Sequence, residues 1–379
     1  MRIFIIARGY PTKQNPQWGC FEKDQALALA KMGHEVVILS YRQHPFIPNL
    51  GYQVVDENGI HAVSYNFLPG RLLGQHGAAI RVRFEKWELK KAYLRAVELY
   101  GKPDVIYSHY LFISIVALCL RQYNVPIVAI EHWSELNREP MSKHILTMGK
   151  NTYPNVQHLI TVSTPLQQRI KNVFGVQPDV LYNMVGEEFT YTKSTHHGPM
   201  RCITTGSLIY RKGFDMFVKA FAQLNLPKDQ WEVTIVGEGP ERKQLQQHID
   251  EAGFQDNIHL IGKKSKQEIA KLLNESDVFV LPSRNENFSV AVLEALACGL
   301  PVVSSICGGI RECINEKNGL LFEVDSVQGL ATCLKHMFYH HQEYNRQAIA
   351  DDCQARFSSE VIAKQLTEIF EDVINKRGQ

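Results

Sequence analysis

Residues 278–303 read VFVLPSRNENFSVAVLEALACGLPVV. The apolar run at residues 278–281 is short, rich in valine and phenylalanine, and stopped by Pro282, which predicts a buried parallel strand. Residues 291–297 have the composition of a helix, which a glycine and a proline then end. A strand, a loop and a helix in succession form the repeating unit of a parallel α/β fold.

Two carboxylates in this stretch indicate a ligand, Glu286 in the predicted loop and Glu294 in the predicted helix. A helix that begins near Phe288 would place Glu294 roughly 9 Å along its axis from the free amides of the first turn. Those amides, at Phe288 and Ser289, suit a phosphate group. We therefore expect a sugar at Glu286, a diphosphate at the helix start and a ribose diol at Glu294. This arrangement predicts a nucleotide-sugar site.

The two acids resemble the E-x7-E signature of retaining glycosyltransferases with the GT-B fold, the large bacterial family called glycosyltransferase family 4 or glycosyl transferases group 1. Pro282-Ser283, Glu286-x-Phe288, Glu294-Ala295 and residues 298–303 all match the pattern of that family. A solvated pair of surface glutamates is the alternative interpretation. The resemblance implies two Rossmann-like β/α/β domains that face a central cleft, with a C-terminal helix that crosses back to the N-terminal domain.

Length and composition exclude several classes of protein. The 379 residues exceed one ordinary core, so two domains are expected. A formal net charge of +2 argues against bulk nucleic-acid binding. The apolar run at residues 3–7 is too short for a signal peptide or a membrane span. Because the eight cysteines include no C-x-x-C pair, a reducing cytosol fits.

Predicted strands alternate with helical segments along most of the chain, which is typical of parallel β/α layers. A polar stretch at residues 191–199 interrupts the alternation and marks the expected linker. We therefore expect an N-terminal domain of residues 1–192, joined by a terminal helix of about residues 360–379, and a C-terminal domain of residues 193–359. The predicted strands are 2–7, 35–40, 105–108, 127–130, 158–161, 202–206, 231–237, 258–261, 277–281, 302–305 and 320–322.

A second donor motif follows the predicted strand 202–206. Gly206 lets the backbone approach a ligand, and Arg211 with Lys212 can neutralise a diphosphate. The family often has an arginine where this chain has Ser207, so Lys212 is the main phosphate contact that the resemblance implies. The alternative interpretation of Arg211 and Lys212 is a solvated surface turn.

Further residues of the expected site come from glycine loops and from the N-terminal half. The resemblance places Gly237 in a loop that lines the donor cleft and Gly19 in a loop near the donor phosphate; an ordinary glycine turn is the alternative for Gly237. His132, just beyond the predicted strand 127–130, would orient the donor sugar. His109 is its rival, and an ordinary loop histidine is the alternative.

A basic and aromatic segment lies between Arg71 and Arg95. Basic and aromatic residues on one amphipathic segment suit an anionic membrane surface or a lipid-diphosphate acceptor. A core-packed helix with a charged outer face is the alternative. The basic residues are Arg71, Arg81, Arg83, Lys86, Lys90, Lys91 and Arg95.

The resemblance thus implies a retaining glycosyltransferase, of hexosyltransferase type, and we expect it to need no metal and no cofactor beyond its nucleotide-diphosphate sugar, a UDP-sugar in our hypothesis. The resemblance implies catalytic roles for Glu286, His132 and Lys212, and a glycan or lipid-linked glycan acceptor in bacterial surface polysaccharide or glycoconjugate assembly. We expect a cytoplasmic enzyme, with the inner face of the membrane as a docking surface. Alternatives are an epimerase or phosphorylase of the same fold and a non-enzymatic two-domain sugar-binding protein.

Overall fold

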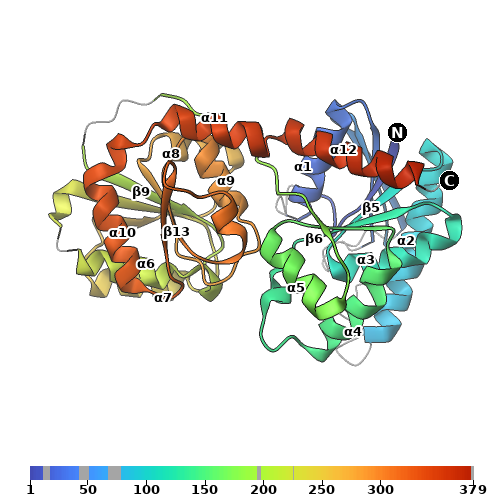
Figure 1. The fold of residues 1–379 in the computed structure, drawn as a ribbon, viewed down its shortest axis with the longest axis horizontal. Coiled ribbons are helices and arrows are strands. Elements are labelled where there is room, and N and C mark those ends of the chain that lie inside the picture. The colour runs from blue at the N-terminus through green and yellow to red at the C-terminus, as the bar shows by residue number, and fades with distance from the viewer. Residues whose placement is uncertain (12–17, 42–50, 67–77, 194–197, 225, 377–379) are drawn as a thin grey trace. The chain divides into compact units, whose positions relative to one another are not determined.

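The computed structural model describes residues 1–11, 18–41, 51–66, 78–193, 198–224 and 226–376. The chain divides into two compact units. Unit 1 is Met1–Leu181 together with Glu360–Gln379, and unit 2 is Tyr182–Ser359. Each unit contains a largely parallel sheet with helices, so the predicted α/β architecture with two Rossmann-like halves is confirmed (Figure 1).

In the described part of unit 1, eight strands form one sheet in the order β3-β4-β2-β1-β5-β6-β7-β8. All neighbouring strands run parallel except β3 and β4. Buried valine and isoleucine fill the central strands on both faces, as expected for a sheet covered by helices. The strands are β1 Arg2–Ile6, β2 Glu35–Ser40, β3 Gly51–Glu57, β4 Ile60–Asn66, β5 Val105–His109, β6 Ile127–Glu131, β7 His158–Thr161 and β8 Asp179–Val180.

The antiparallel hairpin of β3 and β4 was not expected from the sequence. Asn58 and Gly59 form its two-residue turn, because Glu57 pairs directly with Ile60. Both turn residues have positive φ, 53° and 78°, as a type I′ turn requires. β3 is largely exposed, since it lies at the edge of the sheet.

The helices of unit 1 include the C-terminal helix of the chain. In α12, the ring of Phe370 lies 5.2 Å from that of Tyr107 in β5, and Thr367 Oγ1 lies 2.9 Å from His34 Nε2. The expected return of the last helix to the N-terminal half is therefore confirmed (Figure 1). Across the described ranges, every helix is too short or too polar to traverse a bilayer. The helices are α1 Cys20–Lys31, α2 Ala78–Tyr100, α3 Leu111–Ala117, α4 Lys143–Thr152, α5 Thr164–Phe174 and α12 Ser359–Asn375.

In the described part of unit 2, six strands form a wholly parallel sheet in the order β11-β10-β9-β12-β13-β14. The strands are β9 Met200–Thr205, β10 Trp231–Val236, β11 Ile258–Leu260, β12 Val278–Leu281, β13 Val302–Ser305 and β14 Gly319–Phe322. The helices are α6 Phe214–Gln223, α7 Arg242–Glu251, α8 Lys266–Asn274, α9 Val290–Ala297, α10 Val327–His340 and α11 Arg346–Phe357.

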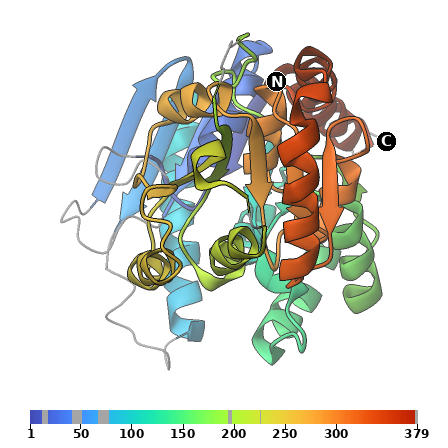
Figure 2. The ribbon, with the colours of Figure 1, turned by 90° about the vertical axis from the view of Figure 1, so that its left-hand side faces the viewer.

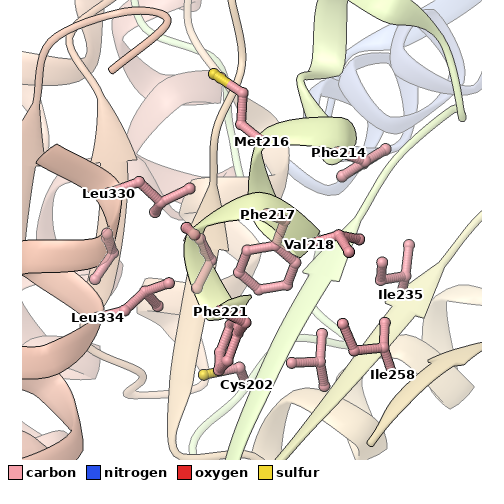
Figure 3. Packing of buried hydrophobic residues seen from close by; sticks show 14 of the residues in the cluster. Cys202, Phe214, Met216, Phe217, Val218, Phe221, Ile235, Ile258, Leu330 and Leu334 are labelled. Carbon is pink, nitrogen blue, oxygen red and sulfur yellow. The ribbon is translucent and has the colours of Figure 1, made fainter. Parts of the chain in front are cut away.

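The core of unit 2 fixes α6 against the sheet. Phe214, Phe217 and Phe221 recur at the spacing of one helix face and are buried. Figure 3 shows Phe217 and Phe221 in one buried cluster with Leu330 and Leu334 of α10. Figure 2 views the side of the sheet that α6 and α10 cover. Because α6 begins two residues after Lys212, this core also holds the basic loop that precedes the helix.

The division between the units falls at Leu181 and Tyr182, not at the expected position 192/193. The reason is local packing that the polar composition of the linker does not reveal. The ring of Tyr182 stacks on that of Phe288 at 4.9 Å, Asn183 Nδ2 donates to the Phe288 carbonyl at 2.9 Å, and Val185 bridges to Ser358. Residues 182–189 are therefore tied to unit 2 before the linker begins.

Candidate functional site

The loops of the predicted donor site meet at one edge of the sheet of unit 2. Gly206 follows β9, residues 282–289 follow β12, and residues 306–309 follow β13, and these three strands are neighbours. In a parallel sheet the carboxyl ends of adjacent strands gather at the same edge, which is where ligands bind in such folds. The candidate site is built from these loops.

Glu286 lies at the centre of this edge, bound to groups from two loops. Its Oε1 accepts hydrogen bonds from Lys212 Nζ at 2.6 Å and from Ser283 Oγ at 2.9 Å. Arg211 Nη1 lies 3.5 Å from Glu286 Oε2 and donates to the Asn285 carbonyl at 2.7 Å. The side chains of Glu286 and Lys212 are only 12% and 13% exposed. The interpretation of Lys212 as part of a solvated turn is therefore wrong.

The charges around Glu286 keep it ionised. Burial alone would raise the pKa of this carboxyl, but the positive charges of Lys212 and Arg211 outweigh that effect, aided by hydrogen bonds from Lys212 and Ser283. The net result is a pKa below the ordinary value. A buried carboxylate that is both ionised and rigidly held is suited to orient hydroxyl groups.

The close approach of the two loops depends on Gly213, the residue after Lys212. Its φ of 69° is in the left-handed region, and a Cβ there would lie 2.0 Å from the carbonyl oxygen of Pro282. Any other side chain would push the loop of Lys212 away from the loop of Glu286. The ion pair therefore requires glycine at this position.

Helix α9 begins later than expected. Its first residue is Val290, and Ser289 precedes it as an extended N-cap, so the expected start near Phe288 is wrong by two residues. Phe288 is instead a core residue, 5% exposed and stacked on Tyr182. The amides available to a phosphate are those of Ser289 and the first turn of α9. The Ser289 hydroxyl oxygen is buried and, within the described residues, makes no hydrogen bond.

Glu294 lies in the second turn of α9 and is half-buried. Because the helix begins at Val290, the axial separation between Glu294 and the first-turn amides is about 6 Å rather than roughly 9 Å. Gly206 and Gly237, the other expected donor residues, lie in direct contact: Gly206 N donates to Val236 O at 2.9 Å, and a Cβ at Gly237 would lie 1.8 Å from Gly206 O. Gly237 therefore has a packing role whether or not it contacts a ligand.

Arg284, which sequence reasoning missed, holds loops of the candidate site together. Its guanidinium binds both oxygens of Asp215 at 2.9 and 3.0 Å, Asp325 Oδ1 at 2.6 Å and the Tyr210 carbonyl at 2.6 Å, and it covers the Tyr210 ring at 4.0 Å. The Arg284 amide also donates to the Arg211 carbonyl at 2.7 Å. Arg284 thus ties the basic loop on both sides of Lys212 to the loop of Glu286. Asp215, the acidic residue in the first turn of α6, was the sequence feature that could have indicated a basic partner here.

A second cluster of polar side chains lies at the carboxyl ends of β1, β5 and β6 in unit 1. His132 follows β6 as expected, and its ring stacks on Tyr110 at 3.9 Å and lies 5.4 Å from the ring of His109. Arg8 follows β1, pairs with the buried Glu22 at 3.1 Å and lies 4.6 Å above the Tyr110 ring. His109 is fully buried. Both ring nitrogens of His109 and Nε2 of His132 make no hydrogen bond within the described residues.

Tyr110 contacts other members of this cluster and has a strained backbone conformation. Its φ of 63° and ψ of 146° lie in a region that is almost reserved for glycine. In this conformation the ring contacts both Arg8 and His132. Strain of this kind persists where the surrounding structure over-determines it, and it clusters at functional sites.

Burial keeps the two histidines neutral. Desolvation and the charge of Arg8 lower the pKa of His109 to about 3. Desolvation, with His109 beside it, also lowers the pKa of His132 well below its ordinary value. The opposite holds at Glu131, whose pKa burial raises to about 7 despite hydrogen bonds from Tyr153 and the backbone. His132 is therefore a neutral donor or acceptor near pH 7.

The remaining expected residues of unit 1 have different environments. Gly19 caps the start of α1, and a Cβ there would lie 2.1 Å from the Gly9 carbonyl oxygen. Arg71 falls outside the described residues. Helix α2 carries the rest of the basic segment and packs on the core through Leu89 and Tyr93, whereas Phe84 and Trp87 are 39% and 38% exposed. Among the described side chains, no group of three His, Cys, Asp or Glu could hold a metal ion.

Known proteins resemble this chain over its whole length. The family model described as "Glycosyltransferase Family 4" matches residues 23–189, and "Glycosyl transferases group 1" matches residues 189–350. Glycogen synthase of Mycobacterium tuberculosis is 26% identical, with 100% of this chain and 96% of that protein covered. The amylovoran biosynthesis glycosyltransferase AmsK of Erwinia amylovora is 28% identical over 71% of this chain and 70% of its own length.

Solved structures share the fold at lower identity. Sucrose-phosphate synthase from Thermosynechococcus elongatus superposes with a TM-score of 0.80 at 20% identity, with 99% of both chains covered. Anabaena Alr3699/HepE in complex with UDP superposes with a TM-score of 0.73 at 18% identity, with 98% of this chain and 99% of that chain covered. These structures bear out the predicted fold class.

Proposed function

The chain belongs to the GT-B glycosyltransferases, those described as glycosyl transferases group 1 and family 4, and on that premise we propose that it transfers a hexosyl group from a nucleotide-diphosphate sugar with retention of configuration. The observation that carries the proposal is the buried ion pair of Glu286 with Lys212 beside the start of α9. In this pair, a carboxylate that can hold a sugar lies 2.6 Å from a cation that can hold the leaving diphosphate.

Each group at the edge of unit 2 has a separate task. Lys212, Arg211 and the amides from Ser289 into α9 take up the negative charge that develops on the departing diphosphate. Glu286 accepts hydrogen bonds from hydroxyls of the transferring sugar and does not attack it. Glu294 holds the ribose, a group that does not change during the reaction.

We propose the following bond changes for this reaction. The bond from the anomeric carbon to the phosphate oxygen breaks, and the bond to the acceptor oxygen forms on the same face of the sugar. The proton of the acceptor hydroxyl passes to the leaving phosphate oxygen. Because the cations of this chain can balance the diphosphate charge, the proposed reaction requires no metal ion. Neutral His132 in unit 1 orients the donor sugar, supported by the stacked Tyr110.

The relatives favour a UDP-sugar and a glycan product. Alr3699/HepE has been solved in complex with UDP and with UDP-glucose, and AmsK is named for amylovoran biosynthesis. We therefore place this enzyme in the assembly of a bacterial surface polysaccharide or glycoconjugate, with a glycan or lipid-linked glycan as acceptor.

The outer face of α2 supports a peripheral membrane contact. Ile80, Phe84, Trp87 and Leu94 are 38–55% exposed and recur close to one side of the helix. Lys91 lies 5.8 Å from the Trp87 ring. Aromatic and basic groups on one face suit anionic lipid, at about 1 kcal/mol for each cation near the surface. The test is flotation with phosphatidylglycerol vesicles: a Lys86, Lys90, Lys91→Glu triple variant should float less than the wild type, and equal flotation would remove this contact.

The transferase proposal is tested with radiolabelled UDP-glucose, UDP-galactose and UDP-N-acetylglucosamine. We expect one of them to be hydrolysed slowly without acceptor, with release of UDP and of an α-configured sugar. Interconversion of two UDP-sugars would indicate an epimerase instead, and phosphate-dependent release a phosphorylase. Tight sugar binding without any UDP release would indicate a binding protein.

A further inference from the structure

A cavity of about 400 Å³ in unit 1 lies outside the clusters described above. One face each of α2, α3 and α4 bounds it, together with the loop after β6. Its apolar wall includes Phe112, Trp133 and Met148, and its polar rim includes His144, Thr147 and Asn151. This size is within the range of small-molecule sites in proteins.

The sequence of α4 explains why the cavity is half polar and half apolar. His144, Thr147, Met148 and Asn151 follow one another at spacings of three, one and three residues, so they share one face of the helix. Met148 is buried at 6%, whereas the three polar residues are exposed. The lining also contains the Phe112 and Trp133 rings, which meet edge to face, with centroids 5.2 Å apart and planes at 76°. Two aromatic rings and a row of hydrogen-bonding groups therefore line the same cavity.

The charge of the lining favours a neutral ligand. Arg81 and Glu85, one turn apart on α2, form an ion pair with 3.7 Å between Arg81 Nε and Glu85 Oε1. Their charges offset each other, and Thr147 and Asn151 add only neutral donors and acceptors. A polyisoprenoid chain would leave this polar half of the lining without partners. A pyranose ring suits both halves, because its C–H face packs on an aromatic ring while its hydroxyls bond to the rim.

We propose that this cavity binds a neutral sugar unit of the acceptor glycan, a unit other than the one that carries the reacting hydroxyl. The assignment rests on the proposed transferase function. Phe112 stacks on Tyr110 at 5.2 Å, and Tyr110 stacks on His132 at 3.9 Å, so the cavity and His132 share one aromatic wall. An acceptor that reaches from this cavity to His132 is an oligosaccharide, and the enzyme extends a chain rather than starting one.

The test uses saturation-transfer NMR with maltotriose, cellotriose and triacetylchitotriose as neutral probes, and with geranylgeranyl phosphate as a lipid probe. Trp133→Ala removes one of the two aromatic rings that line the cavity, and Trp87→Ala is the matched control outside the cavity. Because Trp133 packs partly on the core, a second variant avoids that risk: His144→Leu with Asn151→Leu changes only exposed rim residues of α4. Its control is Lys143→Leu with Lys150→Leu, exposed positions of the same helix that do not line the cavity.

We expect at least one neutral trisaccharide to bind the wild type and both controls, and to bind Trp133→Ala and the rim variant roughly ten- to a hundred-fold more weakly. UDP affinity, measured on the same samples, should not change. The assignment is overturned if no trisaccharide binds the wild type, or if the trisaccharides bind all variants equally. It is also overturned if geranylgeranyl phosphate is the only probe that occupies the cavity. If UDP and UDP-sugars fail to bind while trisaccharide binding depends on Trp133, the proposed transferase function fails and the saccharide site stands.

Discussion

Lys212 Nζ lies 2.6 Å from Glu286 Oε1, although the two residues belong to different loops of unit 2. The pair joins the group proposed to hold the leaving diphosphate to the group proposed to hold the sugar. A substitution at either position therefore changes the electrostatic environment of the other. Removing the charge of Lys212 should weaken nucleotide binding, whereas removing the charge of Glu286 should not. This difference can be measured.

Lys212→Met should weaken UDP binding roughly ten- to a hundred-fold, because it removes a charge-assisted contact and leaves Glu286 facing the diphosphate. Glu286→Gln should bind UDP as tightly as the wild type or more tightly, because Lys212 and Arg211 lose their counter-charge. Its kcat should fall, since the sugar loses its carboxylate partner. Calorimetry of UDP binding and steady-state hydrolysis of the UDP-sugar measure both effects.

The matched control is Lys271→Met on α8, whose side chain is 75% exposed. It should change neither UDP affinity nor kcat. Weaker UDP binding by Glu286→Gln, equal to that of Lys212→Met, would contradict the assignment of opposite roles.

Arg284→Met should destabilise unit 2 and lower kcat together. The change removes the bidentate contact of Arg284 with Asp215 and so weakens the attachment of the loop that carries Lys212. We expect a loss of about 2 kcal/mol in the free energy of unfolding, since Arg284 is 12% and Asp215 24% exposed. Denaturant unfolding and UDP-sugar hydrolysis are the measurements.

Two further variants separate positioning by Arg284 from general stability. Arg284→Lys should recover part of the stability but less of the kcat, because an amine cannot bridge Asp215 and the Tyr210 carbonyl in the same plane. Asp325→Asn should cost less than about 1 kcal/mol, since Asp325 is 57% exposed. A kcat that follows stability in the same proportion through all three variants would contradict a positioning role.

Glu131 should make stability depend on pH. Its pKa is raised from 4.5 to about 7 in the folded protein, so the folded state holds a proton that the unfolded state releases between these values. This contribution to stability is present below pH 4.5 and is lost as the pH rises through 7, by about 3 kcal/mol in total. Glu131→Gln should remove it.

The comparison of wild type with Glu131→Gln isolates this effect from that of His109 and His132. Those histidines have lowered pKa values and act in the opposite direction, but they are present in both proteins. Denaturant unfolding from pH 5 to 8 should show the stability of the wild type falling relative to the variant. Parallel curves would contradict the raised pKa.

Metal removal provides a separate prediction. The cationic side chains Lys212 and Arg211 are proposed to balance the diphosphate charge, so dialysis against EDTA should leave UDP-sugar hydrolysis unchanged within about twofold. Full loss of activity that Mg²⁺ or Mn²⁺ restores would show that the diphosphate needs a metal partner in this protein.

Much of the fold was predictable because hydrophobic runs of the right length report buried strands directly. The strands 35–40, 158–161 and 302–305 were predicted at their observed bounds. The hairpin of β3 and β4 was missed because β3 is an exposed edge strand with little apolar signal, although Asn58-Gly59 was a usable turn signal. The boundary at 181/182 was missed because it depends on the stacking of Tyr182, which composition does not show.

The site was predictable only where a motif fixes a local structure. The placement of Glu286 and Lys212 at one edge follows from the strand order, but their ion pair needs the contact between Gly213 and Pro282, which no spacing reveals. The same holds for Arg284, whose partners Asp215 and Asp325 are distant in sequence. The strained backbone of Tyr110 in unit 1 likewise could not be predicted, since the residues around it have the pattern of an ordinary strand end.

In the proposed complex the nucleotide lies along α9, with its ribose at Glu294 and its sugar at Glu286. Calorimetric titration of UDP into the wild type, Glu294→Ala and Glu286→Ala tests it most directly. Loss of the ribose contact should weaken UDP binding roughly ten- to a hundred-fold in Glu294→Ala, while Glu286→Ala should bind UDP nearly as the wild type does. Normal binding by Glu294→Ala together with lost binding by Glu286→Ala would contradict this placement of the nucleotide.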